Sequence, residues 1–447
     1  MSIFKDCDIR GRYPDEIDEA AAWRVGRAMA SLHPGAAMGV GGDVRLSTPA
    51  LKAALIRGLV EGGVHVKDLG MIPTPALYFS MKRYGLPGGA TVTASHNPPR
   101  FNGIKFMFGD MPVTRADINA LQDICARGDF PSGQGDCEPL DPIPDYLDAL
   151  AKRFAGQRPM KVVVDAGSGA LSAIAPEAFR RCGHEVVELF CEADGRFPMR
   201  DPNPAEYSHL GAVRAKVVEA GADFGVAFDG DGDRAVFITE AGVPVLNEQA
   251  LTLFIRHLLK NRPTPVVYDQ KCSSVVPRAV RAMGGQPAPE RSGHAFIKRR
   301  FLQIGAAIAG EVSGHFFFGE LGYDDGLFAA LMMPEILAAA GKTLGALADE
   351  IALPPITPDL RVHCPYDRQA EWLARIEERL KPLATGVDRL DGVRLEFPDG
   401  WLLARKSVTS EQITLRAEAE TPERLREILE TAADALPPEA RAELLGK

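Results

Sequence analysis

The sequence predicts an α/β protein of four domains, three related α/β units with mixed sheets and a C-terminal α+β domain, arranged around a central cleft. Three observations predict this fold. The chain has 447 residues, too many for one ordinary core. One strand–helix pattern occurs three times, and that pattern changes after residue 356. The expected domains are residues 1–140, 141–243, 244–354 and 355–447.

The three related units each begin with an apolar strand that ends in aspartate. A short polar loop with serine follows, then an amphipathic helix and a glycine before the next strand. Strands that alternate with helices in this way form parallel pairs covered by helices. In the first unit three leucines recur every four residues and predict one buried helix face. The units span 38–70, 161–190 and 265–290, with strand-end residues Asp43, Asp165 and Asp269 and leucines Leu51, Leu55 and Leu59.

The fourth domain is expected from a change of pattern to strand, helix, three strands and a last helix. That helix opens at Thr421, a capping residue followed by proline. Proline-rich stretches at 131–145 and 353–359 are typical of linkers, whereas 261–265 fits a loop within the third domain. Four domains with few direct contacts would enclose a cleft, where ligands tend to bind.

Composition excludes several classes of protein. The hydrophobic fraction of 46% and the charged fraction of 25% are those of globular proteins. A net charge of −9 argues against a nucleic-acid partner, which requires a basic face. The charged start of the chain and the lack of 18 consecutive apolar residues argue against a membrane partner. Seven scattered cysteines without zinc spacing indicate reduced thiols, so we expect a cytoplasmic protein. We also expect a monomer or weak homodimer.

The stretch DGDGDR at 229–234 predicts a metal site. Asp229, Asp231 and Asp233 alternate with glycines, so three carboxylates converge on one turn. They repel one another unless a hard cation neutralises them. An EF-hand also places carboxylates at this spacing, but it needs glycine where this chain has Arg234, and the flanking residues favour strands. Three carboxylates with open coordination positions suit Mg²⁺.

The stretch TASHNP at 93–98 predicts a hydroxyl presented on a rigid loop. Ser95 leaves a strand, and Pro98 and Pro99 prevent a helix from starting there. Its hydroxyl is a candidate nucleophile or phosphate carrier, and a phosphoserine oxygen would complete the metal site. The alternative is a serine that only bonds its own turn.

Four ordered motifs, DIRG (8–11), TASHNP, DGDGDR and GEVSGH (310–315), resemble those of the α-D-phosphohexomutases, the family of phosphomannomutases and phosphoglucomutases. The resemblance covers essentially the whole chain, and it is greatest for the bacterial phosphomannomutase/phosphoglucomutase branch. It implies that hexose 1-phosphates and 6-phosphates of mannose or glucose are interconverted through a phosphoserine and a bound 1,6-bisphosphate. Ser95 would carry the phosphoryl group and, with the three aspartates, bind Mg²⁺. Glucose 1,6-bisphosphate or an equivalent would be the activator.

The resemblance also assigns the residues around the sugar phosphate. Arg10, Lys105 and Arg234 would surround the reacting phosphate, and Lys105 is a candidate general acid/base with His96, His294 and His315 as rivals. Glu311 and Ser313 would bind the sugar 3- and 4-hydroxyls. The remaining sugar or phosphate contacts would be Lys271, His294, His315, Arg405, Ser407, Thr409 and Arg416.

Three departures from the family pattern bear on substrate range. Val408 replaces the usual Asn or Gly of the phosphate loop and resists left-handed backbone angles. Cys7 stands where an aromatic residue often precedes DIRG, and GGDVRLS (41–47) departs from GRDTRxS. Two other functions stay open: a phosphoglucosamine mutase, which usually has Gln at the position of Val312, and a non-catalytic protein that binds sugar phosphate or a cation.

Overall fold

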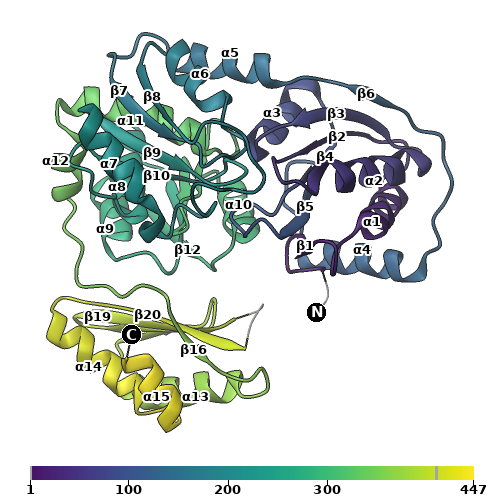
Figure 1. Cartoon of the computed structure of the whole chain (residues 1–447). Coiled ribbons are helices and arrows are strands. Elements are labelled where there is room, and N and C mark those ends of the chain that lie inside the picture. The colour runs from purple at the N-terminus through teal and green to yellow at the C-terminus, as the bar shows by residue number, and fades with distance from the viewer. Residues whose placement is uncertain (1–2, 408–410, 447) are drawn as a thin grey trace.

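The computed structural model describes residues 3–407 and 411–446, and it contains four sheets flanked by helices (Figure 1). Three sheets mix parallel and antiparallel strand pairs, and the fourth is antiparallel throughout. The predicted fold class, three α/β units and a C-terminal α+β unit, is confirmed. Within the described part of the chain, none of the helices combines the length and apolar character that crossing a membrane requires.

The first sheet has six strands, and one of them, the second from an edge, runs antiparallel to both of its neighbours while the other pairs are parallel. Its strands in spatial order are β1 (Ile9–Arg12), β5 (Phe101–Phe108), β4 (Gly88–Val92), β2 (Ala37–Gly42), β3 (His65–Met71) and β6 (Cys137–Pro139). Its helices are α1 (Glu19–Leu32), α2 (Thr48–Glu61), α3 (Thr74–Tyr84) and α4 (Arg115–Arg127). Strand β6 lies inside the predicted linker 131–145, so that linker also forms the sheet edge.

The second and third sheets extend the same plan with antiparallel strands. The second sheet is ordered β10 (Ala235–Thr239), β9 (Phe224–Phe228), β7 (Lys161–Asp165), β8 (Glu185–Leu189), with α5 (Ile143–Arg153), α6 (Ile174–Arg181) and α7 (Gly211–Ala220). The third is ordered β12 (Gln286–Glu290), β11 (Pro265–Asp269), β13 (Ile308–Gly310), β14 (Phe316–Phe318), β15 (Tyr323–Asp324), with α8 (Asn247–Leu258), α9 (Val275–Ala282), α10 (His294–Gln303), α11 (Gly326–Ala340) and α12 (Leu344–Asp349).

The C-terminal unit has one more strand and one more helix than the sequence predicted. Its sheet is ordered β16 (Leu360–His363), β20 (Gln412–Ala419), β19 (Gly400–Lys406), β18 (Val393–Phe397), β17 (Gly386–Asp388), with α13 (Gln369–Leu380), α14 (Pro422–Ala433) and α15 (Pro438–Leu445). The additional strand is β17. Its three residues are too few to show a recognisable alternation of apolar and polar side chains. Thr421 caps α14 as expected, because its side chain accepts a hydrogen bond from the Arg424 amide.

The repeated strand ends are found where the sequence placed them. Asp43 follows β2, while Asp165 and Asp269 end β7 and β11, and all three are buried. The leucines of α2, Leu51, Leu55 and Leu59, are fully buried against the first sheet, which confirms the predicted helix face. Each unit therefore brings one buried acidic side chain to the carboxyl end of a central strand.

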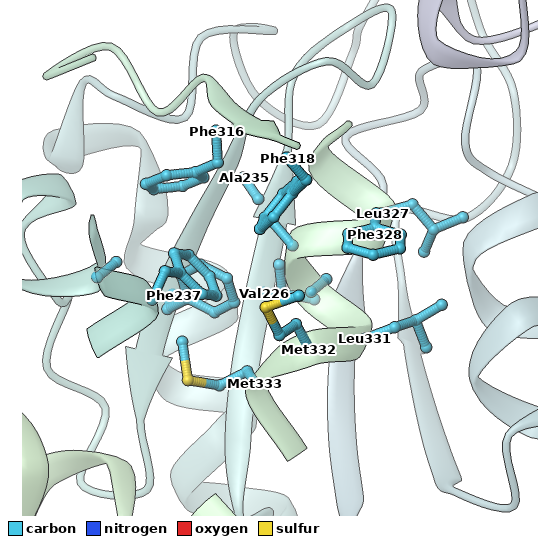
Figure 2. Close-up of a cluster of buried hydrophobic side chains, with 14 of the residues drawn as sticks. Val226, Ala235, Phe237, Phe316, Phe318, Leu327, Phe328, Leu331, Met332 and Met333 are labelled. Carbon is cyan, nitrogen blue, oxygen red and sulfur yellow. The ribbon is translucent and has the colours of Figure 1, made fainter. Parts of the chain in front are cut away.

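The expectation of few direct contacts between domains is wrong for the first three units. A single hydrophobic core includes Leu77 from α3, Phe228 from β9 and Phe318 from β14. Helix α11 joins these units because it is apolar on nearly all sides and packs on β9 and β10 of the neighbouring sheet. Figure 2 shows its side chains against Val226 and Phe237 on one side and Phe318 on the other. The C-terminal unit has a separate core.

Candidate active site

Ser95 lies on a strained turn that follows β4. Its φ of 49° is in the left-handed region, which non-glycine residues seldom occupy outside sites where the surroundings enforce it. The Ser95 amide donates to Thr93 Oγ1 at 2.8 Å. Its Oγ donates to Asp229 Oδ2 at 2.8 Å, so the predicted serine and the predicted metal loop are in direct contact.

Arg45 holds the serine loop from behind. Its guanidinium donates to four backbone carbonyls of the loop and to the Asp43 carboxylate, and the side chain is fully buried. The acceptors are Ser95 O at 2.7 Å, Asn97 O at 2.6 Å, Pro98 O at 2.8 Å, Phe101 O at 3.0 Å and Asp43 Oδ2 at 3.0 Å. A planar fork with five N–H donors is the side chain that can satisfy so many carbonyls at once. Sequence analysis recognised Asp43 as a strand end but did not identify Arg45.

The acidic loop is the turn of the β9–β10 hairpin, which confirms the predicted strands and excludes an EF-hand. Glycine is required twice. A Cβ at Gly230 would lie 2.6 Å from the Ser95 carbonyl oxygen, and Gly232 has a φ of +77°. The Asp229 Oδ1 accepts from the amides of Gly232 at 3.0 Å and Arg234 at 3.2 Å. The loop thus approaches the serine turn with its carboxylates inward.

The three carboxylates are fully buried, and each has an oxygen that could bind a metal within 4.8 Å of the corresponding oxygens of the other two. Burial raises the pKa of Asp229 well above its usual value, and Asp233 and Asp231 add to the effect. Burial also acts on Asp231, but Lys105 outweighs it and lowers the pKa of that carboxyl. No hydrogen-bond donor within the described ranges reaches Asp231 Oδ1 or Asp233 Oδ1. Buried carboxylate oxygens without donors are the ligands a hard cation takes, so this donor set fits Mg²⁺.

The three cations predicted to surround the reacting phosphate all line one cavity, which has a volume of about 600 Å³ and is also lined by Ser95. Lys105 Nζ donates to Asp231 Oδ2 at 2.8 Å and Asp233 Oδ2 at 2.5 Å. Burial would lower the pKa of Lys105, but these two aspartates outweigh it and raise that pKa. Arg10 donates to Asn97 Oδ1 at 2.9 Å, and Arg234 Nε lies 3.8 Å from Asp229 Oδ2. The cavity therefore offers positive charge to an anion beside Ser95.

The three candidate histidines occupy different surroundings. His96 Nδ1 lies 3.4 Å from Ser95 Oγ, and burial together with Arg234 lowers the pKa of His96 well below its usual value, so its ring is neutral. His294 and His315 line the cavity. Both contact Asp324, a buried carboxylate at the end of β15 that sequence analysis did not single out.

The predicted sugar contacts of the third unit divide into two groups. Glu311 is buried and accepts from Ser313 Oγ at 3.1 Å, while no donor among the described residues reaches its Oε1. Lys271 lies apart from them, with Nζ 3.0 Å from Asp359 Oδ2 of the C-terminal unit. None of these three side chains lines the 600 Å³ cavity.

The predicted phosphate contacts of the C-terminal unit are only partly gathered at the cavity. Arg405 lines it and lies 3.1 Å from Asp391 Oδ2. Arg416 lies away from it, paired with Glu248 of α8 at 2.7 Å. The Ser407 amide donates to the Gln412 carbonyl. Thr409 and Val408 lie outside the described residues.

Sequence analysis also missed two side chains that shape the site. Thr74, at the start of α3, donates to Asp231 Oδ2 at 2.7 Å and so ties the first unit to the acidic loop. Lys298 on α10 lines the cavity with its ammonium 3.5 Å from the centre of the Tyr78 ring. Neither residue belongs to a motif that spacing alone could reveal, because their partners come from other units.

A hydroxyl beside a carboxylate cluster, faced by arginine and lysine, suits an enzyme that transfers phosphoryl groups, where catalysis is mostly positioning and electrostatics. Known proteins of that class match this chain. Family models for phosphoglucomutase/phosphomannomutase alpha/beta/alpha domains I, II and III match residues 1–132, 144–242 and 247–353.

Relatives match over nearly their full length. A phosphomannomutase/phosphoglucomutase from Pseudomonas aeruginosa is 36% identical over 96% of this chain and 94% of its own. A phosphoglucomutase from Neisseria gonorrhoeae is 36% identical over 94% and 93%. The crystal structure of a phosphoglucomutase/phosphomannomutase family protein from Burkholderia thailandensis is 36% identical, covers 97% of this chain and 96% of its own, and has a TM-score of 0.91. The chain belongs to the phosphoglucomutase/phosphomannomutase family and is a phosphohexomutase, an enzyme of the isomerase class.

Proposed function

We propose that this enzyme interconverts the 1-phosphates and 6-phosphates of mannose, glucose or both, through phosphorylated Ser95 and a bound hexose 1,6-bisphosphate. The observation that carries the proposal is the contact of 2.8 Å between Ser95 Oγ and Asp229, at a cavity that Arg10, Lys105 and Arg234 also line. A phosphate ester on Ser95 would lie between the carboxylate cluster and these cations.

The chain's own residues account for the transfer. The bond between phosphorus and Ser95 Oγ breaks as the sugar hydroxyl oxygen bonds to that phosphorus. The sugar hydroxyl gives its proton to a base in the site, and Ser95 Oγ takes up a proton as it leaves, which restores the serine hydroxyl. The other phosphate of the resulting bisphosphate then returns to Ser95. Lys105 is held protonated by its two aspartates, which supports a role as a fixed positive charge beside the transferring phosphate. His96, His294 and His315 are the candidates for the base.

Asp229, Asp231 and Asp233 would hold Mg²⁺ together with an oxygen of the phosphorylated Ser95. The ion would neutralise charge on the transferring group. Support comes from the buried carboxylate oxygens that no described donor reaches.

Substrate binding is assigned to the third and C-terminal units. Glu311 and Ser313 would bind the sugar 3-hydroxyl and 4-hydroxyl, which glucose and mannose share. Lys271, Arg405, Ser407, Thr409 and Arg416 would bind the second phosphate. Three of these cations have carboxylate partners in the structure, namely Asp359, Asp391 and Glu248. A phosphate dianion would therefore exchange with these carboxylates as it binds.

A coupled assay tests the function directly. The enzyme is given glucose 1-phosphate, mannose 1-phosphate or glucosamine 1-phosphate with Mg²⁺ and catalytic glucose 1,6-bisphosphate. We expect turnover of glucose or mannose phosphate, and loss of it in Ser95→Ala. Absence of turnover on both glucose and mannose phosphate refutes the proposal. A strong preference for glucosamine phosphate would instead identify a phosphoglucosamine mutase. The names of the relatives do not favour that alternative.

We also propose a cytoplasmic monomer or weak dimer with the four domain boundaries given above.

A further inference from the structure

Asp324 is a buried carboxylate shared by two histidines of the cavity. It ends β15 and has no exposed surface. Its Oδ1 lies 2.8 Å from His294 Nε2, and its Oδ2 lies 2.9 Å from His315 Nδ1. The two rings meet edge to face with their centres 5.1 Å apart, and Phe317 contacts both. One carboxylate therefore faces one nitrogen of each ring.

We propose that Asp324 is a positioning residue that fixes the tautomers of His294 and His315. An ionised carboxylate only accepts hydrogen bonds, so each ring nitrogen that faces it must carry the proton. His294 is thereby held with its proton on Nε2, and His315 with its proton on Nδ1. The unprotonated nitrogen is then Nδ1 on His294 and Nε2 on His315, and a carboxylate with two separate oxygens can impose both tautomers at once.

The assignment for His315 agrees with its second contact. Arg234 Nε lies 2.9 Å from His315 Nε2, and because arginine only donates, that nitrogen must be the acceptor. Arg234 in turn lies 3.8 Å from Asp229, which accepts from Ser95 Oγ. A continuous set of contacts thus runs from Asp324 through His315 and Arg234 to the serine. If the His315 tautomer reversed, two N–H groups would face each other and Arg234 would have to move.

A metal ion is the other way to join these three side chains, because their ligand atoms lie within 4.8 Å of one another. The observed contacts favour hydrogen bonds between these side chains over a shared metal ion. Both oxygens of Asp324 are already within hydrogen-bond distance of a ring nitrogen, and the permanent charge of Arg234 lies against His315. The histidines also lower the pKa of Asp324 well below its usual value, against the opposing effect of burial, so the carboxylate is ionised.

The effect on turnover rests on the proposed function. Whichever histidine takes the proton of the sugar hydroxyl, Asp324 determines which of its nitrogens lacks a proton. On His315 that nitrogen accepts from Arg234, so Arg234 would have to move before His315 could act as the base. General acid–base catalysis contributes roughly 10²- to 10⁴-fold, and the Asp→Asn change in the Ser-His-Asp triad, which leaves the wrong histidine tautomer, lowers kcat by about 10⁴. We therefore expect loss of this control to cost roughly 10²- to 10⁴-fold in kcat.

The test is Asp324→Asn, which keeps the size of the side chain but offers one carbonyl oxygen and one NH₂ group. It can accept from one histidine only, and it presents donors to the other. Nitrogen-15 spectra of histidine-labelled full-length protein report the protonated nitrogen of each ring, with His294→Gln and His315→Gln used for assignment. Asp325→Asn is the matched control. Asp325 is the next residue in the chain and is equally buried, but it caps α11 and accepts a hydrogen bond from Tyr146.

We expect the wild-type spectra to show His294 protonated on Nε2 and His315 on Nδ1, and one of these to reverse in Asp324→Asn. We also expect kcat to fall at least 100-fold in Asp324→Asn with KM changed by less than threefold, and both constants to stay within threefold in Asp325→Asn. Unchanged tautomers in Asp324→Asn, or wild-type tautomers opposite to those stated, overturn the inference. The spectra decide this without turnover, so failure of the mutase assay would refute the proposed function and leave the tautomer result to stand by itself.

Discussion

Replacing Arg45 by methionine tests whether this side chain holds the serine loop in its strained shape. The substitution keeps a long apolar stem but removes all five hydrogen bonds to the loop and to Asp43. It also leaves the buried Asp43 carboxylate without a cationic partner, with only the Thr48 and Thr93 hydroxyls and a backbone amide as donors. Burial already raises the pKa of Asp43. Breaking a buried pair by removing one partner costs about 3–5 kcal/mol. We expect this cost to appear as easier opening of residues 93–101.

Hydrogen exchange measured by mass spectrometry on peptides that cover residues 93–101 is the direct assay. A loss of about 3 kcal/mol corresponds to roughly 100-fold faster exchange of amides that exchange by local opening. Arg27→Met is the matched control, because Arg27 is a buried arginine of the same unit that donates to the Phe130 and Pro131 carbonyls instead. Exchange that is unchanged in Arg45→Met, or equally faster at this loop in Arg27→Met, would refute the reasoning.

Three further predictions concern the metal and two buried groups of the third unit. Chelation with EDTA should reduce turnover at least 100-fold, and added Mg²⁺ should restore it, because the three buried aspartates then repel one another; full activity in chelator would contradict this. Burial raises the pKa of Asp325 to about 7. Between about pH 4 and pH 7 the folded chain therefore keeps a proton that the unfolded chain has lost, and the free energy of unfolding falls as pH rises through this range. Asp325→Asn should therefore gain up to about 4 kcal/mol over the wild type between pH 4 and pH 8, read as a growing difference in Tm. Burial lowers the pKa of Lys298 to about 8, so its charge opposes folding at neutral pH and ceases to do so above about pH 10.5. Lys298→Met should raise stability by up to about 3 kcal/mol at pH 7, and a Tm difference that does not shrink by pH 10 would show the reasoning to be wrong.

Much of the fold could be predicted because local pattern and tertiary packing agree in the first three units. The leucines of α2 are buried as their spacing indicates, and Asp43, Asp165 and Asp269 all reach the ends of central strands. Strand β17 and the packing of α11 could not be predicted. A strand of three residues has too short a pattern, and a helix that is apolar on all sides does not reveal which sheet covers it.

For the candidate site too, residues in local sequence motifs could be predicted, and residues whose partners are distant in the sequence could not. Residues in short motifs, such as Ser95 and the three aspartates, were identified because their chemistry is visible in adjacent positions. Arg45 and Asp324 were missed because their roles depend on carbonyls and imidazoles that are distant in the sequence. The sequence motifs also gave no sign that Arg416 pairs with Glu248 rather than lining the cavity.

The course of α11 has a consequence for building chimeras from members of this family. The helix belongs to the third unit by sequence, yet it packs on β9 and β10 of the second. Exchanging either unit alone between relatives that are 36% identical would join mismatched halves of one interior. The C-terminal unit has an interior of its own and touches the third unit largely through polar side chains such as Arg416 and Lys271. It is therefore the unit that can be exchanged between relatives without rebuilding the interior of the other three.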